Sequence, residues 1–411
     1  MKKLLVLILP ALLYAGNLSS LLNSAENSNY LLKASALNTE AKKKELDAQK
    51  SSFYPALDVG ATYVSFDKVS PFQAGNTLNV YAKAGIDLFD GFRKSSLVEQ
   101  KNSLYEASQY DLTHTQKSLT LSIVQDFFNI KSAEASLKAL KEKSHQLQAD
   151  IKKIKKFKSA GLASQDYVDK LQSSFDTNKY DIESLKLHIK TLKNYLSLKT
   201  GMEIITLDNT TLSNPQNLAF IPSEAIKSLE KQAQALESTA KATSAVYYPN
   251  IRLEDTYGYY DYSKDDGLKK MGTEQVEKQN KIALMANMRL YDNGVNKKQK
   301  QALYLQKRAL QEQINHQKSG EKIRYRLSLD ALKTAILNIE SAKSASKAAR
   351  SAYKTIQAKF NAGIVDQVTY LDSLSQKTAS AARYQKSLND YEIAKATYYF
   401  TSNKNIKDFI K

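Results

Sequence analysis

The sequence predicts an internally duplicated protein that is mostly α-helical and also carries membrane β-strands. Three observations support this fold class. The segment FYPALDVGATY, starting at Phe53, returns in changed form as YYPNIRLEDTY, starting at Tyr247. Two long polar stretches contain apolar residues at alternating spacings of three and four, which is typical of coiled-coil helices. Four shorter runs alternate apolar and polar residues over about ten positions, the pattern of a tilted strand in a membrane barrel.

The first segment, residues 1–15, has the features of a secretory signal peptide. A pair of lysines precedes an apolar core from Leu4 to Leu13, and Ala15 is a small residue before the expected cleavage site. This core is too short to cross a bilayer, and no later stretch approaches about 18 consecutive apolar residues. We therefore expect an exported chain without a transmembrane helix.

The composition argues against an enzyme and against a nucleic-acid-binding protein. There is no cysteine, and the four histidines are dispersed without metal-ligand spacing, so we expect neither a metal site nor a catalytic residue. No phosphate-binding loop motif is present, and no cofactor is expected. The formal net charge is +18, but the lysines alternate with acidic residues along the helices. This pattern favours solvated helix faces, and no nucleic-acid partner is expected.

Helices are expected over four ranges: 16–52, 94–200, 223–246 and 292–400. The seam of the first copy includes Leu140 and Leu147, and the seam of the second includes Leu332 and Ile339, which favours antiparallel coiled-coil packing. Each long stretch is interrupted once, by KSAGLAS and by NAGIVD. The glycine of each break is expected to turn the chain at the tip of a helical hairpin.

The four alternating runs lie in two ranges, 53–93 and 247–291, which we expect to form membrane hairpins. Tyrosines gather at their ends, as in an interfacial girdle. Alternation alone is also compatible with two soluble hairpins that rest on the helices. Four strands cannot close a barrel, and open edges in lipid leave backbone groups unpaired. Two, three or four copies would supply about 8, 12 or 16 strands.

Several short motifs, in the same order in both halves, resemble the TolC-like outer membrane efflux protein family. They are the Tyr-Pro strand entries, the strand exits LFDG and LYDNG, and the hairpin tips KFKSAGL and KFNAGI. The resemblance covers essentially all of the mature chain. It implies a homotrimer in which a 12-stranded β-barrel continues as a barrel of long antiparallel coiled-coil helices. Residues 201–222 and 401–411 would then form the equatorial region around the helical tunnel.

The same resemblance implies a function without chemistry. The chain would be the outer membrane channel of a tripartite efflux or type I secretion system. A periplasmic adaptor (membrane fusion) protein and an inner membrane transporter would deliver the substrate to this passive exit duct. The expected location is the outer membrane of a Gram-negative bacterium, in contact with outer membrane lipid, with a long periplasmic extension. The residues leave open whether the substrate is a drug, a metal ion or a polypeptide.

In the family the tunnel closes at its periplasmic end, and the resemblance assigns a candidate gate by position. Asp372 matches one acidic ring of the bore, whereas Thr369 stands where a second acid is expected. The usual ionic partners are missing, so closure is expected to rest on packing of four residues: Phe360, Val365, Tyr167 and Tyr370. For Asp372, a solvated coiled-coil face is the alternative interpretation.

The hairpin tips are the expected adaptor contacts, formed by Gly161, Leu162, Gly363 and Ile364. A simple turn requires the same glycines, so both roles stay open. The rival function is an exported coiled-coil structural or adhesive protein without a pore. A periplasmic adaptor fits less well, because adaptors of such pumps carry one helical hairpin and several Gly-rich β-domains.

Overall fold

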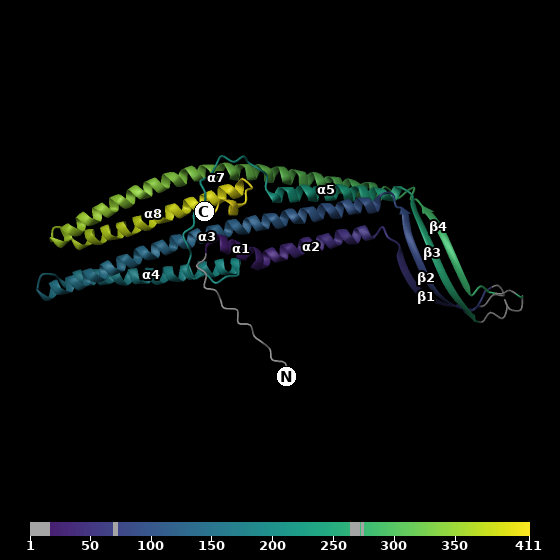
Figure 1. Cartoon of the computed structure of the whole chain (residues 1–411), viewed down its shortest axis with the longest axis horizontal. Helices are drawn as coiled ribbons and strands as arrows, with labels where there is room; N and C mark the ends of the chain where they lie inside the picture. Colours follow the sequence, from purple (N-terminus) through teal and green to yellow (C-terminus); the bar gives the residue numbers. More distant parts are fainter. Residues whose placement is uncertain (1–16, 69–72, 264–271, 273–274) are drawn as a thin grey trace, which may run out of the picture. The chain divides into compact units, whose positions relative to one another are not determined.

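The computed structural model describes residues 17–68, 73–263, 272 and 275–411, and Figure 1 shows the order of its elements. The expected signal peptide, residues 1–15, lies outside the described residues. The elements are α1 (Leu18–Ser28), α2 (Tyr30–Ser51), β1 (Ala56–Ser65), β2 (Asn76–Phe89), α3 (Arg93–Ser159), α4 (Gln165–Thr200), α5 (Glu224–Ser244), η1 (Ala245–Tyr247), β3 (Asn250–Ser263), β4 (Lys278–Asn287), α7 (Val295–Asn361), α8 (Gln367–Thr401) and η2 (Ile406–Phe409). The prediction of a mostly helical chain with a small antiparallel sheet is confirmed.

The chain forms two compact units, and each is described by itself. Among the described residues, the first unit contains 17–36, Leu112–Glu224 and Gln317–Lys411. The second contains Leu37–Asp111 and Ala225–His316. The long helices α3 and α7 contribute residues to both units, because each continues without interruption across a unit boundary.

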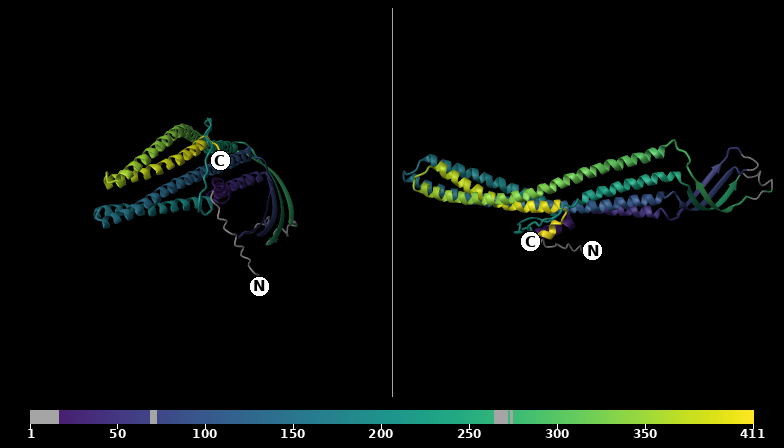
Figure 2. Two further views of the ribbon diagram at one scale, coloured as in Figure 1. Left: turned by 60° about the vertical axis from the view of Figure 1, so that its left-hand side comes forward. Right: turned by 90° about the horizontal axis from the view of Figure 1, so that it is seen from above.

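In the first unit, two helical hairpins place their tips at the same end of the unit (Figures 1 and 2). One hairpin joins α3 to α4, and the other joins α7 to α8. Both α3 and α7 have 67 residues, so each is about 100 Å long at a rise of ~1.5 Å per residue. Helices of this length are stabilised by packing along their apolar seams rather than by residue propensity.

The main core of the first unit lies away from the tips. Fully buried side chains from α1, α3, α4, α7 and α8 meet there with residues of the irregular segment 201–222. Phe127 and Phe128 of α3 contact edge to face at 5.2 Å, and both are almost completely buried. Aromatic contacts of this kind contribute about 0.5–1.5 kcal/mol beyond the burial of their area.

The C-terminal segment packs on the irregular segment in this same core. Leu212 and Ile410 form an isolated antiparallel bridge, and the Ser213 N–H donates to the Phe409 carbonyl at 2.8 Å. The Tyr399 ring stacks on Phe409 at 3.8 Å, and its hydroxyl donates to the Ser213 carbonyl. These contacts satisfy backbone groups in a region that belongs to no regular helix or sheet.

The second unit contains a four-stranded antiparallel sheet in the order β1-β2-β3-β4. Its central pair, β2 and β3, joins strands from the two halves of the sequence. One face is apolar and exposed: Leu57, Val59, Ile282 and Leu284 expose 76, 80, 70 and 67% of their surface. The opposite face carries polar and charged residues, as in the aligned row Asp58, Lys83, Thr256 and Lys281. Period-two alternation produces this separation.

A tight turn follows β2, and a related turn lies between β4 and α7. Asp90 accepts a hydrogen bond from the Lys94 backbone N–H at 2.8 Å, and Asp292 accepts one from the Asn296 N–H at 3.0 Å. Each turn also contains two residues with positive φ, namely Gly91 and Phe92 in the first and Asn293 and Gly294 in the second. In both turns an acidic residue precedes a glycine. The turn ends the strand segment, and the acidic side chain caps the following helix.

Replacing Gly91 with alanine is expected to destabilise the second unit more than replacing Gly294 does. Both residues have φ near +70°, where a side chain costs about 1–2 kcal/mol. A Cβ at Gly91 would also lie 2.6 Å from the Ala245 carbonyl oxygen, whereas a Cβ at Gly294 meets nothing within 4 Å. Chemical unfolding of the purified variants should give a loss about 1–3 kcal/mol larger for Gly91→Ala.

Gly294→Ala is the matched control, because it carries the same backbone strain without the close contact. Equal losses of unfolding free energy in the two variants would contradict the close packing of Gly91 against η1.

Candidate functional site

The two hairpin tips have the same local structure. Gly161 and Gly363 adopt φ of +74° and +73°, and neither has another atom near its missing Cβ. The following backbone N–H groups, of Leu162 and Ile364, donate to carbonyls of the preceding helix at 2.8 and 2.9 Å. This glycine termination closes each helix. It leaves Leu162 and Ile364 exposed by 76 and 70%, so each tip presents an aliphatic side chain.

Along the helices next to the tips, the two hairpins contact each other through an apolar cluster. Its buried members come from all four helices of the hairpins: Leu147, Ile151, Ile154, Val168, Leu171, Tyr353, Tyr370 and Leu374. Tyr370 of α8 is 1% exposed. Phe360 of α7 stacks on its ring at 4.5 Å with an interplanar angle of 6°. Stacking and burial therefore hold Tyr370 in a single position at the contact between the hairpins.

A hydrogen-bond network crosses this apolar contact. The Tyr370 hydroxyl donates to the Asp150 carboxylate of α3 at 2.6 Å. Gln146, one turn earlier on α3, donates to the same carboxylate at 3.0 Å and to the Tyr370 oxygen at 3.3 Å. The Tyr353 hydroxyl lies 3.3 Å from that of Tyr370. The network therefore joins α3 of one hairpin to α7 and α8 of the other.

Burial changes the acid–base properties of this network. Burial raises the pKa of Asp150, while hydrogen bonds from Tyr370 and Gln146 partly oppose the rise. Burial, followed by the hydrogen bond to Asp150, also raises the pKa of Tyr370. Tyr370 therefore remains a neutral donor near neutral pH. The charged form of Asp150 is less stable here than in water, because a buried charge loses hydration.

The structure brings together three of the six candidate gate residues and separates the others. Phe360, Tyr370 and Tyr167 belong to the same apolar cluster. Gln367 also donates to the Tyr167 carbonyl at 2.6 Å, which adds a second link between the hairpins.

The other three lie at the surface near the start of α8. Val365 is half-buried just before the helix, and the Thr369 N–H donates to the Asp366 cap. Asp372 is exposed and accepts a hydrogen bond from Gln376 at 2.8 Å. Asp372 and Thr369 therefore do not take part in the contact between the hairpins.

Sequence reasoning did not single out Asp150, Gln146 or Tyr353, although a signal was present. Asp150 is the one acidic residue between Glu142 and Asp166, in a stretch otherwise rich in lysine. It also directly precedes the seam residue Ile151. An isolated carboxylate beside an apolar seam requires a partner on a facing helix, because a buried charge needs hydrogen bonds.

Further from the tips, the hairpins separate around a groove of about 600 Å³. Small residues such as Ala135, Ala139 and Ala381 leave this space. Cross-hairpin hydrogen bonds flank it, from Asn389 to Ser132 and from Lys143 to Ser375, each at 3.0 Å. Its wall carries four cations and one acid: Lys138, Lys343, Lys347, Arg350 and Glu142.

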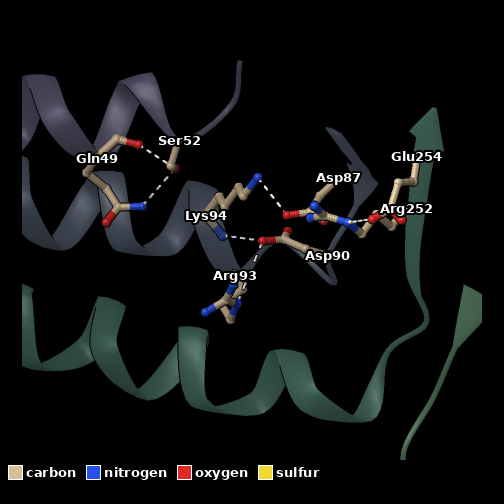
Figure 3. Close-up of polar contacts among 8 residues, drawn as sticks. All are labelled: Gln49, Ser52, Asp87, Asp90, Arg93, Lys94, Arg252 and Glu254. Carbon is tan, nitrogen blue, oxygen red and sulfur yellow. Dashed lines mark hydrogen bonds and ion pairs between the residues drawn. The ribbon is translucent and has the colours of Figure 1, made fainter. Parts of the chain in front are cut away.

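In the second unit, ion pairs connect the sheet to the first turn of α3 (Figure 3). Asp87 on β2 binds Lys94 at 2.9 Å and Arg252 on β3 at 3.0 Å. Arg252 also lies 3.6 Å from Glu254, which in turn lies 3.7 Å from Lys83. All four strand residues are on the polar face. The network bridges strands from opposite halves of the chain and fixes where the helix begins relative to the sheet.

Part of the chain matches a known protein family. Residues 21–201 match the sequence pattern of the family described as outer membrane efflux protein. The match covers less than half of the chain. The predicted resemblance to TolC-like outer membrane efflux proteins is thereby confirmed.

Solved structures share the fold of this chain over nearly its whole length. A membrane protein from Pseudomonas aeruginosa superposes with a TM-score of 0.82 at 16% identity, covering 94% of this chain and 93% of that chain. The outer membrane protein VceC from Vibrio cholerae gives 0.81 at 12% identity, covering 95 and 96%. The Campylobacter jejuni CmeC outer membrane channel gives 0.81 at 15% identity, covering 95 and 86%. No curated protein matches the sequence.

In the described ranges, no helix is both long and apolar enough to cross a membrane. The same ranges hold no group of three or more histidine, aspartate or glutamate side chains suited to a metal ion.

Replacing Asp150 with asparagine should remove a pH dependence of stability. The pKa of Asp150 in the native state is raised above its unfolded value of about 3.9. Over the pH range between these two pKa values, the native state therefore binds more protons than the unfolded state. The unfolding free energy of the parent should therefore fall as pH rises through this range. Asp150→Asn keeps an acceptor for Tyr370 and should lack this fall. Urea unfolding between about pH 4 and 7 measures the difference.

Asp366→Asn provides a control, because Asp366 affects the pH dependence of the unfolding free energy in the opposite direction. A hydrogen bond from the Thr369 backbone N–H lowers the pKa of Asp366. Its contribution to stability is therefore present above the unfolded pKa and is lost as pH falls through the lowered value. Parallel curves for the parent and Asp150→Asn would show that burial does not perturb Asp150.

Proposed function

We propose that this chain is an outer membrane efflux channel, the passive exit duct of a tripartite efflux or type I secretion system. Three copies would together form a 12-stranded barrel in the outer membrane and a helical tunnel in the periplasm. The observation that carries the proposal is the sheet of the second unit. It has four strands, an exposed apolar face, an opposite charged face and two edges without partners in the described chain.

The sheet needs other copies because of its edges. In a bilayer, unpaired N–H and C=O groups on β1 and β4 would cost several kcal/mol each. A closed barrel removes both edges. Eight strands would leave an interior filled with side chains, whereas about 12 strands leave room for a pore. In such a barrel, the apolar face contacts lipid and the row containing Lys83 and Lys281 faces water.

The proposed domain assignment follows from this arrangement. Hairpins 53–93 and 247–291 lie in the outer membrane, and the helical ranges 16–52, 94–200, 223–246 and 292–400 form the periplasmic tunnel. The paired segments 201–222 and 401–411 form the equatorial region around it. The chain requires no energy source of its own, because an inner membrane transporter drives the substrate.

The contact around Tyr370 is proposed as the part of the gate that holds the two hairpins of one copy together. The Asp150–Tyr370 hydrogen bond and the Phe360–Tyr370 stack both join elements that must separate if the α7–α8 hairpin moves away from the α3–α4 hairpin. Asp372 and Thr369, which lie outside this contact, are proposed to face the bore. Val365 packs beside them at the constriction.

The tips are proposed as the docking sites of a periplasmic adaptor. Leu162 and Ile364 are large, aliphatic and exposed, and they occupy equivalent positions on the two hairpins. Three copies would therefore present six similar apolar contacts in a ring. Burying exposed apolar side chains is the main favourable term in protein association.

Tyr370→Phe should increase the open probability of the purified channel in planar bilayers. The variant keeps the ring that stacks on Phe360 but removes the hydroxyl that donates to Asp150. A hydrogen bond to a charged group contributes about 1.5–3 kcal/mol, so the closed state should lose roughly a factor of ten or more in relative population.

Tyr384→Phe is the matched control on the same helix. Among the described residues, no hydrogen bond is formed by the Tyr384 hydroxyl, which lines the groove. Equal open probabilities for the parent and Tyr370→Phe would remove this contact from the gate.

Asp372→Ala should change the single-channel conductance or the block by divalent cations. Three copies would place three carboxylates around a narrow bore, where like charges attract cations. Traces that are identical for the parent and the variant would show that Asp372 lies on a solvated helix face outside the bore.

The alternative function is an exported coiled-coil structural or adhesive protein that never enters lipid. Membrane extraction separates the two functions. A structural protein would be released from membranes by salt or urea, whereas an inserted trimer would require detergent.

A further inference from the structure

We propose that β4 of one copy pairs with β1 of the next copy in a register that sets Arg289 opposite Asp58. The inference rests on the proposed trimer and adds to it the residues of the contact between subunits. It follows from the internal duplication together with the observed pairing of β2 with β3.

The duplication makes two junctions between strands equivalent. Tyr54 before β1 corresponds to Tyr248 before β3, which is 194 positions later. Asp90 after β2 corresponds to Asp292 after β4, which is 202 positions later. The β2–β3 junction, where one half of the chain meets the other, is therefore equivalent to a junction between β4 and the β1 of the next copy. The first is present within the chain, and the second requires another copy.

The observed register can be transferred across this equivalence. Asp87 on β2 is the register partner of Arg252 on β3, and their side chains form an ion pair at 3.0 Å. The residue equivalent to Asp87 is Arg289, and the residue equivalent to Arg252 is Asp58. The two positions have exchanged their charges, so the attraction would be retained at the subunit junction. A random pair of substitutions has no reason to preserve opposite signs at two positions separated by more than 200 residues.

The lengths of the strands point to the same junction. β2 pairs with β1 only as far as Gly85, yet it continues to Phe89 because β3 pairs with it there. β4 ends at Asn287, where its pairing with β3 ends. Residues 288–291 are the equivalents of 86–89 and lack a partner within the described chain. The β1 strand of a second copy would supply that partner and lengthen β4.

The register also keeps apolar and polar faces together. It places Val59 opposite Met288 and, beyond the irregularity that the β2–β3 pairing has between Asp87 and Phe89, Leu57 opposite Tyr291. All four residues are exposed on the single chain. Asp58 and Arg289 fall between these pairs on the polar face. A slip of one residue would exchange the faces of one strand. A slip of two would place Asp58 opposite Asn287 or Tyr291, neither of which carries a positive charge.

Both charged residues are exposed at the edges of the sheet. Within the described ranges, neither Asp58 nor Arg289 forms an ion pair. Lys83, the neighbour of Asp58 across β1 and β2, instead lies 3.7 Å from Glu254. The edge carboxylate and the edge guanidinium are thus available to each other across a contact between copies.

Cysteine pairs test the register directly, because the chain contains no cysteine of its own. The full-length protein carrying Asp58→Cys and Arg289→Cys is purified in detergent, oxidised with copper phenanthroline and run on a denaturing gel. Covalent dimers and trimers are expected. The control pair combines Asp58→Cys with Asn287→Cys. Asn287 lies two residues out of register with Asp58, about 7–8 Å away, which is beyond the reach of an unstrained disulfide.

The outcomes separate the register from the proposed function. Stronger cross-linking of the control pair, in a protein that is trimeric by light scattering and conducts in bilayers, would overturn the register alone. A water-soluble monomer that does not insert into liposomes would overturn the proposed function and the register together. Preferential cross-linking of positions 58 and 289 supports the inference.

Exchanging the charges gives a second test that does not require cysteine. Arg289→Asp should lower the temperature at which the detergent-purified trimer dissociates, because it places two carboxylates opposite each other. The double variant Asp58→Arg with Arg289→Asp restores opposite charges and should recover most of that loss. Additive losses in the double variant would show that the two side chains do not meet.

Discussion

The edges of a β-sheet impose the constraint on which this architecture depends. Each strand supplies backbone donors and acceptors to two neighbours, and β1 and β4 have only one neighbour each in the described chain. An unpaired edge is costly outside water, so the proposed membrane location requires further strands beside β1 and β4. The exposed apolar face adds to the same demand, since water is a poor solvent for it. The turns and ion pairs where the sheet meets the helices then hold the two edge strands in a fixed geometry.

The two halves of the chain are similar in outline but differ at the base of the sheet. In the first half, Lys94 joins Asp87 and lies 5.9 Å from the Phe53 ring, so the start of α3 is tied to β2. The equivalent of Lys94 is Asn296, which binds the Asp292 turn and forms no such ion pair. The first junction is therefore completed by contacts within its own chain, whereas the second leaves charged groups for contacts elsewhere.

Sequence patterns predicted the parts of this fold that depend on local periodicity. The seams around Leu147 and Leu332 predicted the long helices, and both residues are buried. The alternating runs predicted strands because each strand separates two faces. The turn glycines at 161 and 363 were recognisable because only a few residues tolerate positive φ. Such features require no knowledge of what lies on the other side of the helix or strand.

The contacts between distant segments could not be predicted in the same way. Asp150 and Tyr370 are 220 positions apart, and their hydrogen bond depends on which faces of two coiled coils meet. An apolar helix seam predicts that another helix packs against it, but it does not predict which residue of that helix lies opposite. The same holds for Asp87 and Arg252, whose pairing follows from the register of β2 on β3. The family resemblance indicated where a gate should lie, but the motifs do not encode the hydrogen bond between Tyr370 and Asp150 that joins the two hairpins.

The equal lengths of α3 and α7, at 67 residues each, limit how this sequence can change over time. A single inserted residue would rotate everything beyond it by about 100°, and so move the seam off its partner helix. Insertion of seven residues would keep the seam but displace one tip by about 10 Å. Mutations that change length are therefore tolerable only when all four arms of the two hairpins gain or lose the same number of heptads. Loops at the outer ends of the strands carry no such restriction, so natural variation in length should concentrate there.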